Sequence, residues 1–141
     1  MNLTDTFDSP DLLRELKDYG FDLEKDLKRT GLGQSGYNQI LQDVADDLEN
    51  DRSGSRLIQS EKYSDLAVYK MRCKDPKRNS GKRGGYRIIL VAALCETSFI
   101  CHIYHKHAGK KPKTDLTSNE KNQLRKLVSN LEKVREASEK E

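Results

Sequence analysis

The sequence predicts an α+β domain with helices on one face of an antiparallel sheet of three to four strands, followed by a C-terminal helix. Apolar residues recur at helical spacing between residues 12 and 48 and again between 124 and 134. The segment between them shows the two-residue period and the unbroken apolar run that are typical of strands. The 141 residues are enough for one domain with its own core, spanning 1–141. We expect the other sheet face to stay at least partly free.

The N-terminal part is expected to be mainly helical. Residues 2–7 are a candidate first strand, and Ser9 and Pro10 have the residue types of a helix N-cap and first turn. Gly20 interrupts the apolar pattern that follows, which leaves either one helix with a weak point or two shorter helices. Residues 37–50 are expected to form a further amphipathic helix with acidic residues on its exposed side.

Three strands are expected in the middle of the chain. Residues 66–73 alternate between apolar and polar side chains, residues 86–94 are almost entirely apolar, and residues 99–107 form the last strand. Basic loops at 74–85 and 108–114 follow the first and the last of them. The basic residues are therefore expected near the ends of neighbouring strands.

The C-terminal segment predicts one long helix. Thr117 and Glu120 have the spacing of a capping box, in which each side chain bonds the backbone N–H of the other. The apolar stripe that follows comprises Leu124, Leu127, Val128, Leu131 and Val134.

Charge is distributed unevenly along the chain. Residues 1–60 carry 7 bases and 13 acids, residues 61–114 carry 13 bases and 4 acids, and residues 115–141 carry 6 of each. The chain thus consists of an acidic helical part, a basic sheet part and a neutral C-terminal helix with a charged tail. The basic block indicates either a polyanion partner such as a nucleic acid or a solvated face.

Several classes of protein are excluded at this level. The longest apolar run, residues 88–95, is too short to span a bilayer, and the N-terminus lacks the apolar stretch of a signal peptide. We therefore expect a cytoplasmic protein without a membrane partner. Cys73, Cys95 and Cys101 are an odd number without a CxxC motif and are expected to be reduced, buried thiols.

Neither a metal nor a cofactor is expected. Cys101, His102, His105 and His107 lie close in sequence, but their spacing fits no common zinc motif. His102 is interpreted as a sheet histidine without a special function. No nucleophile elbow, P-loop or dinucleotide fingerprint occurs.

The candidate site is a convergence of cations at one end of the sheet. Lys70 and Arg72 project to the same side of one strand, and Arg87 opens the next strand, while His105, Lys106 and His107 end the last one. The segment places no carboxylate to neutralise them, since Asp75 lies in the loop. A phosphodiester would explain such a set, because Lys and Arg can orient it and stabilise the charge that develops during its cleavage. Glycines 81, 84 and 85 would let a nucleic-acid backbone approach closely.

Four segments in this order resemble the RelE/HigB superfamily of bacterial toxins, closest to its HigB-like branch. They are the K-x-R strand at 70–72, GKRGG-x-R-I-I at 81–89, I-Y-x-K at 103–106 and D-L-T at 115–117. The resemblance covers residues 66 to about 128, whereas residues 1–60 match in layout only.

The resemblance implies a RelE-like fold and a ribosome-dependent mRNA endoribonuclease, an mRNA interferase, which inhibits translation. Cleavage in that family is metal-independent attack of the RNA 2′-hydroxyl on the adjacent phosphate. The implied partners are mRNA, the ribosome and a cognate antitoxin of helix-turn-helix type.

The resemblance also implies residue roles. The catalytic candidates are Lys70, Arg72, Arg87 and Lys106, with His105 or His107 for proton transfer. The candidates for RNA contact are Lys82, Arg83, Gly84, Gly85, Tyr104, Lys110 and Lys111.

Two alternatives belong to other functional classes. One is a non-catalytic RNA- or ribosome-binding protein of the same fold, which would bind with strong salt dependence and cleave nothing. The other is a toxin that resembles the gyrase-poisoning ParE relatives and has a protein target. That branch generally lacks the converging basic set.

Overall fold

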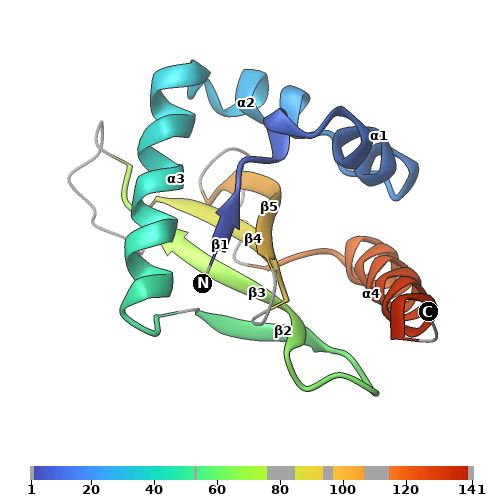
Figure 1. The fold of residues 1–141 in the computed structure, drawn as a ribbon. Helices are drawn as coiled ribbons and strands as arrows, with labels where there is room; N and C mark the ends of the chain where they lie inside the picture. Colours follow the sequence, from blue (N-terminus) through green and yellow to red (C-terminus); the bar gives the residue numbers. More distant parts are fainter. Residues whose placement is uncertain (1, 53, 76–84, 94–96, 107–114, 140–141) are drawn as a thin grey trace.

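The computed structural model describes residues 2–52, 54–75, 85–93, 97–106 and 115–139. Figure 1 shows an α+β fold whose helices surround a single open sheet. Within the described residues the elements are β1 (Asn2–Thr4), a 3-10 turn (Thr6–Asp8), α1 (Pro10–Asp18), α2 (Leu23–Thr30), α3 (Gly33–Glu49), β2 (Ser55–Gln59), β3 (Leu66–Cys73), β4 (Tyr86–Ala93), β5 (Thr97–His105) and α4 (Ser118–Glu139).

The sheet is larger than expected and is not purely antiparallel. In the described part of the chain it has 5 strands in the order β1-β5-β4-β3-β2. The short β1 runs parallel to β5, and the remaining neighbours are antiparallel. The expected number of three to four strands is wrong because β2 was missed. The register of β2 shifts between Arg56 and Ile58, so Leu57 and Ile58 do not show the alternation from which a strand is recognised.

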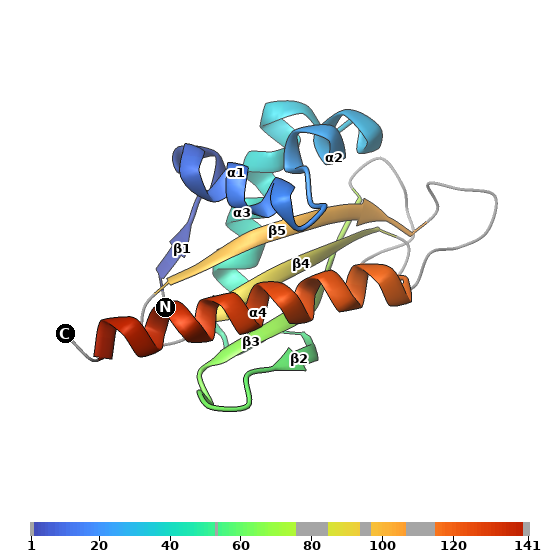
Figure 2. The same cartoon turned by 90° about the vertical axis from the view of Figure 1, so that its right-hand side faces the viewer.

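Helices cover both faces of the sheet, so the expectation of helices on one face and a partly free second face is wrong. Figure 2 shows α4 lying along one face of β3, β4 and β5, while α3 lies behind the sheet. One buried cluster joins Tyr37, Ile40 and Val44 of α3 to the sheet. A second cluster joins Leu124 and Leu127 of α4 to the opposite face. Two apolar stripes therefore sandwich the sheet, which is buried on both sides.

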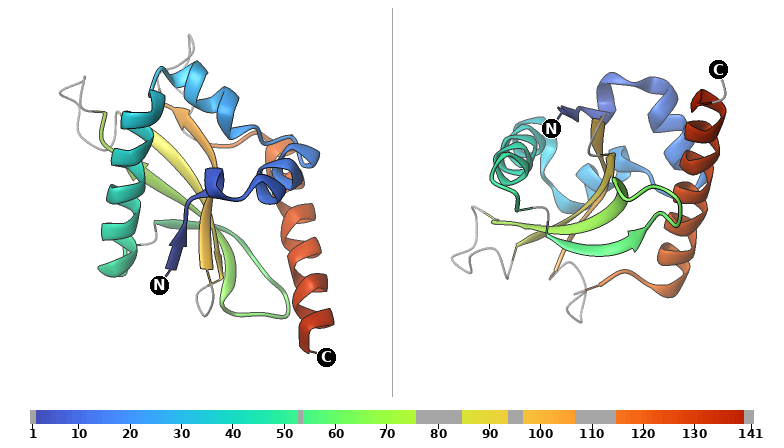
Figure 3. Two further views of the ribbon diagram at one scale, coloured as in Figure 1. Left: turned by 45° about the horizontal axis from the view of Figure 1, so that its top comes forward. Right: turned by 60° about the horizontal axis from the view of Figure 1, so that its bottom comes forward.

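The N-terminal helical region is divided in two at Gly20. This glycine has φ +86°, a left-handed conformation that ends α1, and α2 ends at Gly31 with φ +70°. Ser9 caps α1 and Pro10 occupies its first turn, as the sequence predicts. Figure 3 shows α1 and α2 beside β5, at the side of the sheet opposite β2.

The long C-terminal helix and its capping box are confirmed. The Thr117 N–H donates to Glu120 Oε1 at 2.9 Å, and the Glu120 N–H donates to Thr117 Oγ1 at 3.1 Å. Cys73 and Cys101 are buried, whereas Cys95 lies outside the described residues. None of the helices in the described segments combines the length and apolar composition needed to cross a bilayer.

Candidate nucleic-acid interface

A row of polar side chains crosses three strands on the sheet face that α4 covers. Arg72 of β3 pairs with Arg87 of β4, and Arg87 pairs with Tyr104 of β5. Lys70 begins the next row on the same face, where it is opposite Ile89, which in turn is opposite His102. The structure thus brings together Lys70, Arg72 and Arg87, as expected, and adds Tyr104 to their row.

The members of this row differ sharply in exposure. Arg72 is exposed and Lys70 is partly buried, but Arg87 is only 3% exposed and Tyr104 only 4%. Burial of Arg87, followed by the charge of Arg72, lowers the pKa of its guanidinium. Its Nη1 donates to the Gly85 carbonyl at 3.5 Å. Arg87 is thus a cation held in a poorly solvated position, where its field is screened weakly.

Tyr104 is held as a neutral phenol. Burial raises its pKa to about 12, with the negative charge of Asp115 adding to that effect and the positive charge of Arg87 opposing it. At neutral pH the phenol keeps its proton. The hydroxyl can therefore donate a proton or a hydrogen bond to a developing anion on this face.

Carboxylates reach the basic face from outside the basic segment, from Asp115 just before α4 and Glu120 in its first turn. Asp115 Oδ1 lies 3.9 Å from Lys70 Nζ, and its Oδ2 lies 3.0 Å from Lys121 Nζ. Burial alone would raise the pKa of Asp115, but the bonds from Lys121 and the Leu116 N–H and the charge of Lys70 lower it overall. The carboxylate that faces Lys70 is therefore ionised at neutral pH.

His105 does not join this face. It pairs with Tyr86 across the strands, on the opposite side of the sheet from Arg87. Its Nε2 lies 2.9 Å from Asp75 Oδ2, and its ring meets that of Tyr86 edge-on with centroids 4.8 Å apart. Lys106 follows at the strand end, where its N–H donates to the Gly85 carbonyl at 3.2 Å.

Gly85 is required by the packing of the chain against itself. A Cβ there would lie 2.1 Å from the Cys73 carbonyl oxygen and 2.8 Å from the Asp75 nitrogen. The close approach is therefore between two segments of this chain. The remaining candidates lie outside the described residues: His107, Lys82, Arg83, Gly84, Lys110 and Lys111.

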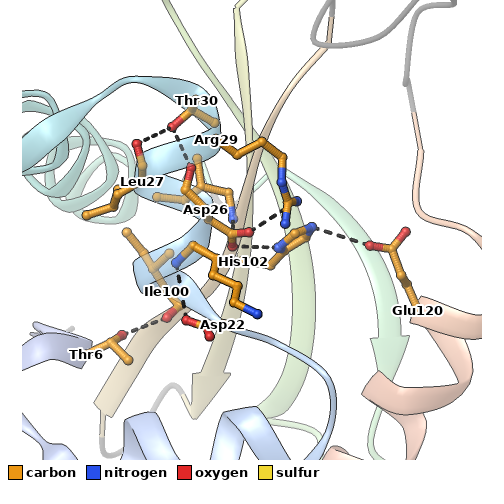
Figure 4. A network of polar contacts seen from close by, with 11 residues as sticks. Thr6, Asp22, Asp26, Leu27, Arg29, Thr30, Ile100, His102 and Glu120 are labelled. Carbon is orange, nitrogen blue, oxygen red and sulfur yellow. Dashed lines mark hydrogen bonds and ion pairs between the residues drawn. The ribbon is translucent and has the colours of Figure 1, made fainter.

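A buried ionic network next to this row was missed by the sequence analysis. His102 is 5% exposed and lies between Asp26 of α2 and Glu120 of α4 (Figure 4). Its Nδ1 is 2.7 Å from Asp26 Oδ2, and its Nε2 is 3.4 Å from Glu120 Oε2. Asp26 Oδ2 also accepts the Ile103 N–H at 3.1 Å, and Arg29 Nη1 lies 3.6 Å from Asp26 Oδ1.

This network favours the protonated form of His102. Burial alone would lower its pKa, but the hydrogen bonds and charges of Asp26 and Glu120 outweigh burial and raise it. One feature of the sequence is consistent with this buried network. Asp26 follows Leu23 by three residues, and these are the two buried residues of α2, so an acid lies on an apolar stripe. No sequence pattern connects Asp26 to His102.

In the described residues, no three His, Cys, Asp or Glu side chains are grouped so as to hold a metal ion. Comparisons with protein-family models, with curated proteins and with solved structures found no match to this chain.

Proposed function

We propose that this chain is a ribosome-dependent mRNA endoribonuclease of the RelE/HigB type, the toxin of a toxin–antitoxin module. The observation that carries the proposal is the row Arg72–Arg87–Tyr104, with Lys70 beside it, on one face of three adjacent strands. Two guanidiniums and an ammonium can orient and neutralise a phosphodiester, and a neutral phenol can donate a proton during its metal-free cleavage.

The proposed reaction is a transfer within the RNA. The 2′-oxygen forms a bond to the adjacent phosphorus while the bond from phosphorus to the 5′-oxygen breaks. A base on the enzyme takes the 2′-proton, and an acid returns a proton to the departing 5′-oxygen. The products are a 2′,3′-cyclic phosphate and a free 5′-hydroxyl. The step consumes no water and needs no metal ion.

The exposure and charge of each residue support a separate role for it in this reaction. The exposed Arg72 and the partly buried Lys70 orient the phosphate, since they are accessible to a ligand. The buried Arg87 stabilises the charge that develops in the transition state, because its field is weakly screened. Tyr104 and Lys106 are the candidates for proton transfer among the described residues, because His105 faces the other side of the sheet.

The decisive experiment is translation in vitro with purified components and a defined mRNA, with 5′ ends mapped by primer extension. We expect cuts within codons that require ribosomes. Arg72→Ala should slow cleavage by about 100-fold, as loss of a group that positions the reacting phosphate does. Arg56→Ala is the matched control, because Arg56 is an exposed strand arginine above Tyr69, on the opposite sheet face. Intact mRNA at saturating, folded protein, or equal loss in both variants, would contradict the proposal.

The partners and the location follow from the same proposal. An mRNA interferase acts where ribosomes are, so the protein would be cytoplasmic and would be silenced by a cognate helix-turn-helix antitoxin. A small adjacent open reading frame with a helix-turn-helix pattern would support this assignment.

One observation favours a second candidate, a non-catalytic RNA- or ribosome-binding protein. Arg87 and Tyr104 are almost completely buried, and His105 faces away from them. A protein that kept the basic face but lost its acid and base would bind RNA with steep salt dependence and leave it intact. The primer-extension experiment separates these two functions directly.

A further inference from the structure

The burial of the central row conflicts with its use by a phosphate. Arg87 and Tyr104 are 3% and 4% exposed, although Arg72 at the end of the same row is open to solvent. A phosphodiester cannot contact side chains that are covered to this degree. The protein that covers this end of the face must therefore move before the buried members of the row meet a ligand.

Residues 115–120, which comprise the approach to α4 and its first residues, lie over this end of the face. Leu116 is 6% exposed and belongs to the same buried cluster as Tyr104. Asp115 approaches Lys70 at 3.9 Å, and Glu120 approaches His102 at 3.4 Å. Both contacts place a carboxylate against a basic side chain, so this segment occupies the basic face with the same chemistry that a phosphate would use.

The rest of α4 is held against the sheet by contacts that do not involve residues 115–120. Its middle buries Leu124 and Leu127 completely. Near its C-terminal end, Arg135 makes two hydrogen bonds of 2.8 Å and 2.7 Å to Asp65. The Asp115 side chain, by contrast, is 45% exposed. Residues 115–120 can thus separate from the sheet at lower cost than the body of the helix.

Resting on the RNA-binding function proposed above, we propose that residues 115–120 form an autoinhibitory strap over the basic row. The RNA phosphate takes the place of the Asp115 carboxylate at Lys70, and the strap leaves Tyr104 and Arg87 as the phosphate enters. The free protein is therefore held in a closed state, and RNA affinity includes the cost of opening it.

The first test measures opening without RNA. Phenylglyoxal labels exposed arginines, and mass spectrometry reports the rate at each position, with the exposed Arg72 as an internal reference. The strap variant is Asp115→Asn/Glu120→Gln, which keeps a residue suited to the capping box. We expect Arg87 labelling to rise by about fivefold or more when these two contacts weaken, while Arg72 labelling stays constant.

The matched control changes the same charges at the other end of the helix. Glu132 accepts hydrogen bonds from the Ser60 hydroxyl and the Glu61 backbone N–H, and Glu136 pairs with Lys62. Glu132→Gln/Glu136→Gln loosens α4 there and removes two carboxylates without touching the strap. Its Arg87 labelling should match that of the unmodified protein. An equal rise in both double variants, or a rise in neither, would overturn the strap.

The second test measures competition with RNA. Binding of a fluorescent 2′-O-methyl RNA, which cannot be cleaved, is followed by anisotropy at fixed salt. We expect the strap variant to bind about tenfold more tightly, because its contacts to Lys70 and His102 are weakened. The control should change by about threefold at most, from net charge alone. Equal affinities in the two variants would overturn the competition, whatever the labelling shows.

The labelling and RNA-binding experiments distinguish a failure of the strap proposal from a failure of the proposed function. If Arg87 becomes open in the strap variant but RNA binding is absent or unaffected by Arg72→Ala, the strap exists and the proposed function is wrong. If RNA binding depends on Arg72 but Arg87 labelling does not change, the proposed function stands and the strap is wrong.

Discussion

The Asp26 carboxylate lies 2.7 Å from Nδ1 of His102, across 76 residues of sequence. This contact joins α2 to the central part of β5, and the other ring nitrogen faces Glu120 at the start of α4. One buried imidazole thereby ties the N-terminal and C-terminal helices to the same strand. A single substitution in this network should therefore affect the packing of both α2 and α4 on β5.

Asp26→Asn should destabilise the protein. Asp26 is 2% exposed and its carboxylate bonds His102 and accepts the Ile103 N–H, so the neutral amide leaves the buried His102 ring poorly paired. We expect a loss of about 3 kcal/mol in the free energy of unfolding, measured by urea denaturation. Asp22→Asn is the control, because asparagine still caps α2, and it should cost less than about 0.5 kcal/mol. Equal losses would contradict a special role for Asp26.

The stability that His102 provides should depend on pH. Its folded pKa is raised above the unfolded value of about 6.5. The contribution is therefore fully present below about pH 6.5 and is lost as the pH rises through the higher folded pKa. The groups that face the ring are Asp26, Glu120 and Tyr104, and Arg29 pairs with Asp26. Urea unfolding of the protein and of His102→Gln should differ more at pH 6 than at pH 9, and a constant difference would contradict the assignment.

Gly85→Ala should cost more than an ordinary glycine substitution. Its Cβ would meet the Cys73 carbonyl at 2.1 Å, so the ends of β3 and β4 would have to separate. We expect a loss of about 2 kcal/mol or more, by thermal or urea unfolding. Gly31→Ala is the comparison, since it has φ +70° but nothing within 4 Å of the new Cβ, and should cost about 1 kcal/mol. Comparable losses would show that the steric contact is not decisive.

Arg135→Lys should loosen the end of α4 while leaving its middle in place. The guanidinium bonds both Asp65 oxygens and lies 4.8 Å from the centroid of the Tyr63 ring, and lysine can reproduce neither geometry. We expect a loss of about 1 kcal/mol, together with faster amide hydrogen exchange in the last turns of α4. Arg125→Lys, at an exposed site bonded to Asn122, should change neither quantity.

Local patterns predicted the elements well where one physical signal dominated. The alternation in residues 66–73 gave the observed bounds of β3, and the capping box located the start of α4. The helix start at Ser9 and Pro10 was also correct. Each of these signals acts between residues that are close in sequence. Where the signal was broken, as at the bulge in β2, the strand was missed.

The candidate site was predicted in part for the same reason. Strand alternation alone places Lys70 and Arg72 on one side of β3, and pairing with the next strand adds Arg87. The same alternation separates Tyr104 from His105, so His105 faces the opposite side, beside Asp75. The choice between these two neighbours depended on the register of β5 against β4, which residue types do not reveal.

The alternation of β3, the caps of α1 and α4 and the concentration of bases in residues 61–114 follow from the amino-acid order alone, because each depends on neighbours along the chain. The cover of α4 over the basic face and the contacts of Asp115 with Lys70 and of Asp26 with His102 arise only when the chain packs. Those contacts join segments up to 76 residues apart. They form because two apolar stripes must each find a face of the sheet, and that packing brings the charged residues at the helix ends together.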